Sequence, residues 1–188
     1  GPVGGAQVPP AALKQYFGAH WKREQFRAFR KRLLRYNPIL RAAISRSRWI
    51  LAANEDTERL LLQLGAVRVS RELETAVTMP TGKITFPTGN RSDKLFTVVW
   101  AGSLILRKAP LLAIDVFAEA VHRGLQIRML MIGDGPLRPD VERAIRSRGI
   151  AEHVSLLGSV PYSQMARYYD EGDAFLFTSL QDTSGNVV

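Results

Sequence analysis

Residues 95–136 read LFTVVWAGSLILRKAPLLAIDVFAEAVHRGLQIRMLMIGDGP and contain the clearest secondary-structure signal of the chain. The apolar run over residues 95–101 is rich in β-branched and aromatic side chains, so it predicts a strand buried on both faces. Pro110 then opens a predicted helix that continues to about His122. A second apolar run over residues 126–132 predicts the next strand. Strand, helix and strand in this order are typical of a βα unit with parallel strands.

The same alternation continues to the end of the sequence, and Gly149 and Ser163 are interpreted as a helix stop and a helix N-cap. Four strands that alternate with helices predict an α/β fold with a parallel sheet. The further predicted elements are helices over 140–148 and 162–169 and strands over 153–157 and 173–178. The core side of the helix over 110–122 is expected to carry Leu111, Ile114, Val116, Phe117 and Val121.

The first half of the sequence is less regular. Residues 10–47 are predicted to be helical with an interruption at Asn37–Pro38, and Asn54 is predicted to cap a helix that ends near Gly65. A short strand is predicted over residues 49–53. Because residues 79–93 are rich in proline and glycine, they are interpreted as a linker. The predicted organisation is therefore a partial first domain over 1–79, a linker over 80–93 and a second domain over 94–188.

Composition excludes several classes of protein. The chain has 188 residues, of which 46% are hydrophobic and 23% charged, and this balance is typical of globular proteins. It has no cysteine, which rules out disulfides, zinc–thiolate sites and iron–sulfur clusters, and its three histidines are scattered, so no metal site is expected. No apolar run reaches the roughly 20 residues that span a bilayer. No secretory signal is visible, so the expected location is the cytoplasm.

Positive charge is concentrated at one place. The net charge of +9 lies entirely before Lys94, and between Lys14 and Arg48 eleven basic residues accompany the single acid Glu24. Three explanations stay open: a surface helix that packs its apolar side inward, a helix on an anionic membrane surface, or a nucleic-acid site. Nucleic acid is not expected, because no recognised binding motif accompanies the charge. The apolar arc of the predicted helix holds Trp21, Phe26, Phe29, Leu33 and Tyr36.

A loop of small or polar residues follows each predicted strand of the second half. Parallel strands bring their carboxyl ends to one edge, where such sheets bind ligands, so the loops are expected to meet there. Main-chain N–H groups at glycines and at a helix N-terminus form an anion site, to which Lys108 would add a point charge. For any single loop, ordinary turn chemistry is the better explanation of the small residues, and only the four loops together favour a ligand site. Because the P-loop and dinucleotide fingerprints are both missing, the residues predict a phosphorylated ligand that is held without either motif. The loops are Gly102–Ser103, Gly133–Gly135, Gly158–Ser159 and Ser179–Gly185.

An ordered set of short motifs resembles the retaining glycosyltransferases of family 4, the group 1 glycosyltransferases of GT-B fold. WAGSL with Arg107 and Lys108 looks like the family's G-R/S-L…K-G element, with Ala109 where glycine is usual. IGDGP is similar to its G-x-G-P turn, and VSLLGSVP to its V-x-F-L-G-x-V-P segment. SLQDTSGNVV matches the start of its E-x7-E segment. In the first half, GPVGG at residues 1–5 looks like a family loop, and ILAAN at residues 50–54 resembles the strand before its interdomain region.

The resemblance implies an incomplete GT-B protein: the Rossmann-like parallel sheet of the C-terminal domain and the C-terminal portion of the N-terminal domain. Members transfer a sugar from a nucleotide-diphosphate sugar with retention and without a metal, so no cofactor is expected. The expected acceptor is a lipid-linked or surface polysaccharide glycan or a glycolipid, with the protein at the inner face of the membrane. The alternative is a non-catalytic basic module that binds membrane or nucleic acid.

The chain is expected to be truncated at both ends. Counted eight places on from Asp182, the second carboxylate of the family's pair falls at position 190. Little transferase activity is therefore expected from these residues alone.

The resemblance also implies roles for single residues. Asp182 and Lys108 are the expected catalytic residues, with Asp182 in place of a glutamate that faces the donor sugar. Lys108 and Ser103 would face the diphosphate with Arg107 as a helper, although many members have arginine where Ser103 stands. The other expected binding residues are Gly102 at the phosphate site beside Ser103, Gly133 and Asp134 near the nucleoside, Ser159 and Val160 near the base, and Gly185, Asn186, Val187 and Val188, whose N–H groups would hold phosphate.

Overall fold

This computed structural model describes residues 11–72 and 95–180. The chain divides near residue 77 into two compact units, which are described separately below. The predicted linker and most of the predicted loop over Ser179–Gly185 lie outside the described residues. The domain boundaries at 79 and 94 stay a prediction.

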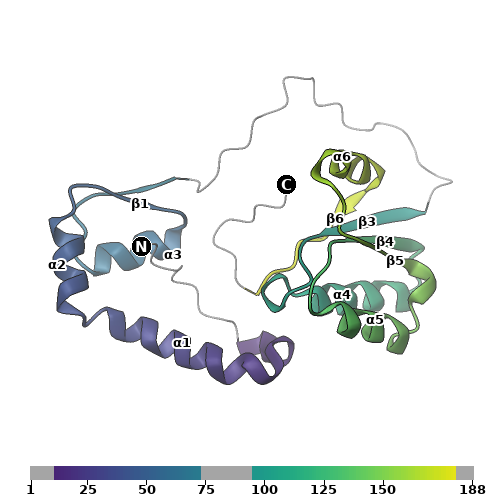
Figure 1. The fold of residues 1–188 in the computed structure, drawn as a ribbon, viewed down its shortest axis with the longest axis horizontal. Helices are drawn as coiled ribbons and strands as arrows, with labels where there is room; N and C mark the ends of the chain where they lie inside the picture. The colour runs from purple at the N-terminus through teal and green to yellow at the C-terminus, as the bar shows by residue number, and fades with distance from the viewer. Residues whose placement is uncertain (1–10, 73–94, 181–188) are drawn as a thin grey trace. The chain divides into compact units, whose positions relative to one another are not determined.

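The second unit is built on a four-stranded parallel sheet (Figure 1). The predicted α/β fold is thereby confirmed, with each strand beginning within one residue of its predicted start. The strand order β5-β4-β3-β6 places the first strand in the centre, so the chain winds outward in both directions from it. The strands are β3 (Phe96–Ala101), β4 (Ile127–Ile132), β5 (Val154–Gly158) and β6 (Ala174–Phe175).

Helices cover both faces of this sheet, as Figure 1 shows. α4 (Pro110–His122) and α5 (Arg138–Ser147) pack on one face, and α6 (Tyr162–Glu171) packs on the other. Side chains alternate between the faces along each strand, as a pleated backbone requires. Trp100 and Met131 point to α4 and α5, whereas Val99 and Ile132 point to α6. The prediction that the first strand is buried on both faces is confirmed for its central residues.

Several local predictions for this unit are wrong. Val116 is 48% exposed on α4 rather than part of the core. Ser163 does not cap α6, because the helix begins at Tyr162 and Pro161 precedes it without a side-chain cap. α5 begins at Arg138, two residues before the predicted start. β6 has two residues rather than six, because the chain after it turns toward the start of α4.

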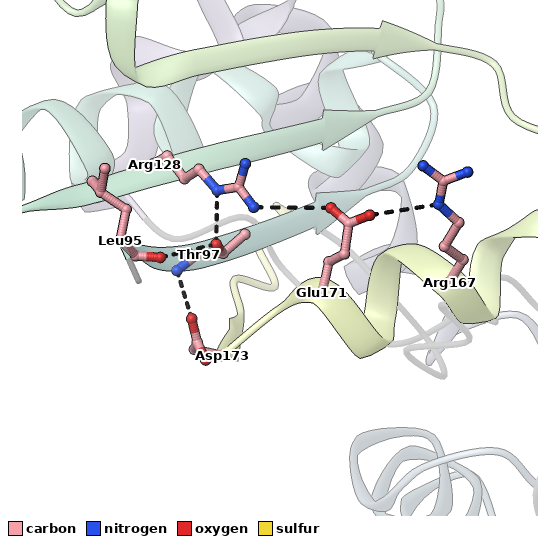
Figure 2. Close-up of polar contacts among 6 residues, drawn as sticks. All are labelled: Leu95, Thr97, Arg128, Arg167, Glu171 and Asp173. Carbon is pink, nitrogen blue, oxygen red and sulfur yellow. Dashed lines mark hydrogen bonds and ion pairs between the residues drawn. The ribbon is translucent and has the colours of Figure 1, made fainter. Parts of the chain in front are cut away.

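A polar cluster joins three elements at the amino ends of β3 and β4 (Figure 2). The Nε atom of Arg128 on β4 donates to the hydroxyl of buried Thr97 over 2.9 Å, and the main-chain N–H of Thr97 donates to the Asp173 carboxylate over 2.8 Å. Glu171 at the end of α6 lies 3.9 Å from Arg128 and 3.5 Å from Arg167. These contacts tie β4, β3 and the α6–β6 connection together at the end of the sheet opposite the glycine loops.

The first unit has a small core and a short parallel sheet. The predicted cap at Asn54 is confirmed, because its side chain accepts from Thr57 N–H. At the predicted interruption, the side chain of Asn37 caps α2 by accepting from the N–H groups of Ile39 and Leu40, a role that was not predicted. β2 was not predicted; it pairs in parallel with β1. The elements are η1 (Ala11–His20), α1 (Trp21–Leu34), α2 (Pro38–Arg46), β1 (Ile50–Ala52), α3 (Glu55–Gln63) and β2 (Val69–Arg71). The buried core consists of Ile44, Ala52, Leu61 and Leu64.

Helix α1 does not bury its apolar arc. Its inward side is formed by Trp21, whose ring lies 5.3 Å from that of buried Phe17, and by Glu24, whose carboxylate pairs with Arg27. The other members of the arc are between half and three-quarters exposed: Phe26, Phe29, Leu33 and Tyr36. An ordinary surface helix with its apolar side inward, the first of the three explanations, is therefore wrong for this face. Within residues 11–72 and 95–180, no helix is both long and apolar enough to cross a membrane.

Candidate functional site

The loops that follow β3, β4 and β5 meet at the carboxyl edge of the sheet, as predicted. The main-chain N–H of Gly102 donates to the carbonyl of Ile132 over 2.9 Å, and that of Gly133 donates to the carbonyl of Gly158 over 2.7 Å. Hydrogen bonding thus continues past the strand ends and holds the three loops side by side. The result is a rigid edge made of backbone rather than of long side chains.

Glycine is required where two of these loops touch. Gly133 has a φ of +127°, and a Cβ atom there would overlap the carbonyl oxygen of Gly102. At Gly135 a Cβ atom would come within 2.7 Å of the Leu104 carbonyl oxygen. The turn at Gly133–Gly135 therefore packs backbone against backbone on the loop after β3, and Leu104 N–H donates to the Asp134 carbonyl over 2.9 Å. Because glycine has no side chain, the main chain at this edge of the sheet can approach a ligand closely.

Lys108 lies over this glycine edge. It ends the short helix η2 (Leu106–Lys108), and Ala109 then takes the left-handed conformation at φ 49° before α4 begins. A Cβ atom on Gly102 would be 3.8 Å from Cγ of Lys108, and the Lys108 ammonium lies 5.6 Å from the ring centroid of Phe177 after β6. The structure therefore brings Lys108, Gly102 and Gly133 together. The left-handed conformation of Ala109 is one that glycine adopts most easily, and glycine is the residue usual at this position in the family that the sequence resembles.

Hydroxyl groups after β6 hold the Lys108 segment in place. The Thr178 hydroxyl donates to the carbonyl oxygens of Lys108 and Ala109, at 3.0 and 3.1 Å from Oγ1. The same oxygen accepts a hydrogen bond from the buried indole N–H of Trp100 over 2.9 Å. Ser179 Oγ donates to the Arg107 carbonyl over 3.0 Å. The segments that follow β3 and β6 thus meet at the point where the strand order reverses, which is where doubly wound sheets bind ligands. Trp100, Thr178 and Ser179 were not predicted as positioning residues, although a buried indole N–H usually has a hydrogen-bond partner.

The start of α4 adds partial positive charge at the same place. Pro110 occupies the first turn, no side chain caps the helix, and the helix runs for 13 residues. The N–H groups of a first turn have no partner within their own helix, and the aligned peptide dipoles favour an anion there. The Lys108 ammonium and these amide N–H groups are all positive, so they would attract the same anion. The arrangement is suited to a phosphate or diphosphate.

Asp134 and Arg138 lie at the neighbouring turn. Asp134 Oδ1 accepts from Gly135 N–H over 2.7 Å, and its other oxygen is 3.7 Å from Arg138, which also donates to Glu142 over 3.0 Å. A Cβ atom on Gly158 would lie 3.6 Å from the Arg138 guanidinium. Arg138 therefore borders the loop predicted to meet a base. Arg138 was not predicted as a site residue, although its spacing of four residues from both Asp134 and Glu142 predicts ion pairs on one face of a helix.

The remaining residues predicted to bind the ligand are of three kinds: exposed at the edge of the sheet, packed in the core, or outside the described residues. Ser103 and Ser159 are exposed at the edge, as is Arg107. Val160 packs with the core cluster under α6, so only its backbone can face a ligand at the edge. The others lie outside the described residues: Asp182, Gly185, Asn186, Val187 and Val188.

Comparison with known proteins agrees with this geometry. Residues 96–188 match the family model described as Glycosyl transferases group 1. An alpha-D-kanosaminyltransferase of Streptomyces kanamyceticus is 28% identical over 91 residues, which are 48% of this chain and 24% of that protein. An alpha-monoglucosyldiacylglycerol synthase of Acholeplasma laidlawii is 28% identical over 97 residues, 52% of this chain and 24% of that protein. The chain thus spans about a quarter of the length of these relatives.

Solved structures show the same fold. The apo form of the lipopolysaccharide outer core galactosyltransferase WaaB matches with a TM-score of 0.64 at 20% identity, over 81% of this chain and 42% of that one. The structure of TarM matches with a TM-score of 0.62 at 14% identity, over 78% of this chain and 28% of that one. The parallel α/β architecture is that of GT-B glycosyltransferases. Residues 96–188 therefore belong to the group 1 glycosyltransferase family.

Proposed function

We propose that the second unit is the donor-binding part of a glycosyltransferase that moves a sugar, with retention, from a nucleotide-diphosphate sugar to a glycan or glycolipid acceptor. The observation that carries the proposal is the position of Lys108. Its side chain lies over Gly102, beside the start of α4 and beside the segment that follows β6. The Lys108 cation thus lies beside the main chain of Gly102, at the point where the strand order of the sheet reverses.

The chemistry follows from the charge that develops during transfer. When the sugar leaves, negative charge builds up on the departing diphosphate, and groups already aimed at that charge lower the barrier. In this proposal Lys108 and the first-turn amides of α4 meet the diphosphate without a resident metal, and Ser103 and Arg107 contribute from the rim. The amides of 185–188 add further donors, and Asp182 binds hydroxyls of the donor sugar.

Nucleoside binding is assigned to the adjoining loops. The turn at Gly133–Gly135 would lie against the ribose and base, with Asp134 held in position by its own turn and by Arg138. Ser159 and the backbone of Val160 would meet the edge of the base. Among fold neighbours, HepE of Anabaena was crystallised with UDP and glucose, and a TarM mutant with UDP, so UDP is the first ligand to try.

The acceptor class is proposed from the relatives. Two relatives have names that include a lipid: the alpha-monoglucosyldiacylglycerol synthase described above and the phosphatidylinositol N-acetylglucosaminyltransferase GPI3 subunit of Saccharomyces cerevisiae. They support a glycolipid as the acceptor. Because the chain spans about a quarter of such relatives, nucleotide binding is a sharper readout than turnover.

The test is titration calorimetry of the purified chain with UDP and with GDP. Lys108→Ala is expected to weaken nucleotide binding by about tenfold or more, because a charge-assisted hydrogen bond contributes about 1.5–3 kcal/mol. Lys108→Arg should keep part of the affinity. Arg123→Ala removes an exposed cation just after the other end of α4 and should leave the affinity unchanged. Equal affinity in wild type and Lys108→Ala, or no binding of either nucleotide, would contradict the proposal.

A further inference from the structure

Helix α1 of the first unit presents an apolar stripe to solvent between rows of arginine. Phe26, Phe29 and Leu33 are 63%, 57% and 50% exposed. Their spacing of three and four residues aligns them along one side of the helix. We call these three side chains, with Arg23, Arg30 and Arg32 beside them, the basic aromatic face.

The arginines of this face carry uncompensated charge. In the described parts of the chain no carboxylate lies within ion-pair distance of Arg23, Arg30 or Arg32, and the nearest acid on the helix, Glu24, pairs with Arg27 over 2.6 Å on the inward side. All three arginines are exposed. The face therefore combines a positive potential with apolar area that water solvates poorly.

The first turn of α1 packs inside its own unit. Trp21 packs against Phe17, and Glu24 is largely buried with a side chain only 14% exposed. The helix is thus anchored in its unit near its N-terminal end, through Trp21 and Glu24, and the basic aromatic face stays exposed further along the helix. An orientation fixed in this way can present the whole stripe at once to a flat surface.

We propose that the basic aromatic face docks this protein on an anionic lipid bilayer. A helix of this kind lies in the plane of the interface, with aromatic and aliphatic side chains at the acyl boundary and arginines at the level of the phosphates. Nucleic acid fits less well, because single strands stack their bases on aromatic rings, and Leu33 at the C-terminal end of the stripe has no ring. Long arginine side chains can extend from the flanks to the headgroups while the stripe is buried.

The experiment is sedimentation of the purified chain with vesicles of phosphatidylcholine alone and of phosphatidylcholine mixed equally with phosphatidylglycerol. Wild type is expected to bind the mixed vesicles and to release as salt is raised, because surface attraction is screened. Arg23→Gln/Arg30→Gln should lower partitioning by about 30-fold, at roughly fivefold per arginine. Phe26→Ala/Phe29→Ala should lower it at least about tenfold through lost apolar contact.

Matched variants in the second unit serve as controls. Arg143→Gln/Arg146→Gln on α5 removes the same net charge, and Val116→Ala/Leu125→Ala removes exposed apolar area; both should bind as wild type does. Far-ultraviolet circular dichroism must show equal helix content in every variant compared. The proposal is overturned if wild type binds pure phosphatidylcholine equally well, if neither α1 variant weakens binding, or if a single-stranded oligonucleotide is bound and the mixed vesicles are not.

Discussion

At the scale of the residue, Gly133 has no room for a side chain. Its φ is +127°, and a side chain there would overlap the Gly102 carbonyl. Gly133→Ala is expected to cost about 3 kcal/mol or more of unfolding free energy, since backbone strain and overpacking add. Gly149→Ala is the matched control: Gly149 also has a positive φ, 68°, but has open space around it, so its cost should be about 1 kcal/mol. Urea denaturation measures both, and equal costs would mean that the close approach does not matter.

Thr97 is the central residue of the polar cluster in Figure 2. Its buried hydroxyl accepts from Arg128 and donates to the Leu95 carbonyl over 3.2 Å. Thr97→Val keeps the shape but removes both hydrogen bonds, and should cost about 1–2 kcal/mol. Thr97→Ser keeps the hydroxyl and should retain the Arg128 hydrogen bond. The comparison is made by urea denaturation, and a valine variant as stable as wild type would show that the cluster contributes nothing.

At the scale of the element, α6 is held to the sheet through Tyr169. Burial raises the pKa of the Tyr169 hydroxyl, and repulsion from ionised Tyr162 raises it further. The neutral form is favoured in the folded state, so the stability it contributes is fully present below pH 10, the ordinary tyrosine pKa, and is lost as the pH rises above it. Unfolding free energy measured from pH 9 upward should therefore fall more steeply for wild type than for Tyr169→Phe. Parallel curves would contradict the assignment.

The elements also show what the sequence could and could not predict. β3, β4 and β5 were predicted nearly to the residue, because each is an apolar run that ends at a glycine. The meeting of Lys108, Gly102 and Gly133 was predictable too, since parallel strands end at a common edge. β6 was predicted too long, because the Thr178 hydroxyl bonds carbonyls some 70 residues earlier. β2 was missed because three half-polar residues, Val69 to Arg71, carry almost no periodic signal.

At the scale of the whole molecule, the two units have separate hydrophobic cores. Among the residues that the structure describes, the core cluster of the first unit contains four buried residues, whereas the cluster under α4 and α5 in the second unit contains twelve. The two clusters share no residue. Because stability grows with buried apolar area, the first unit should be the less stable of the two.

Calorimetric unfolding of the chain is therefore expected to show two transitions, with the first unit unfolding at the lower temperature. Leu61→Ala removes a buried side chain from the first core and should lower only the first transition, whereas Ile114→Ala should lower only the second. Each substitution should shift its own transition by about 10 °C or more, since truncating a core aliphatic costs about 2–5 kcal/mol. A single transition that both substitutions lower would show instead that the units unfold as one cooperative body, and the two cores would then have to be energetically coupled despite sharing no residue.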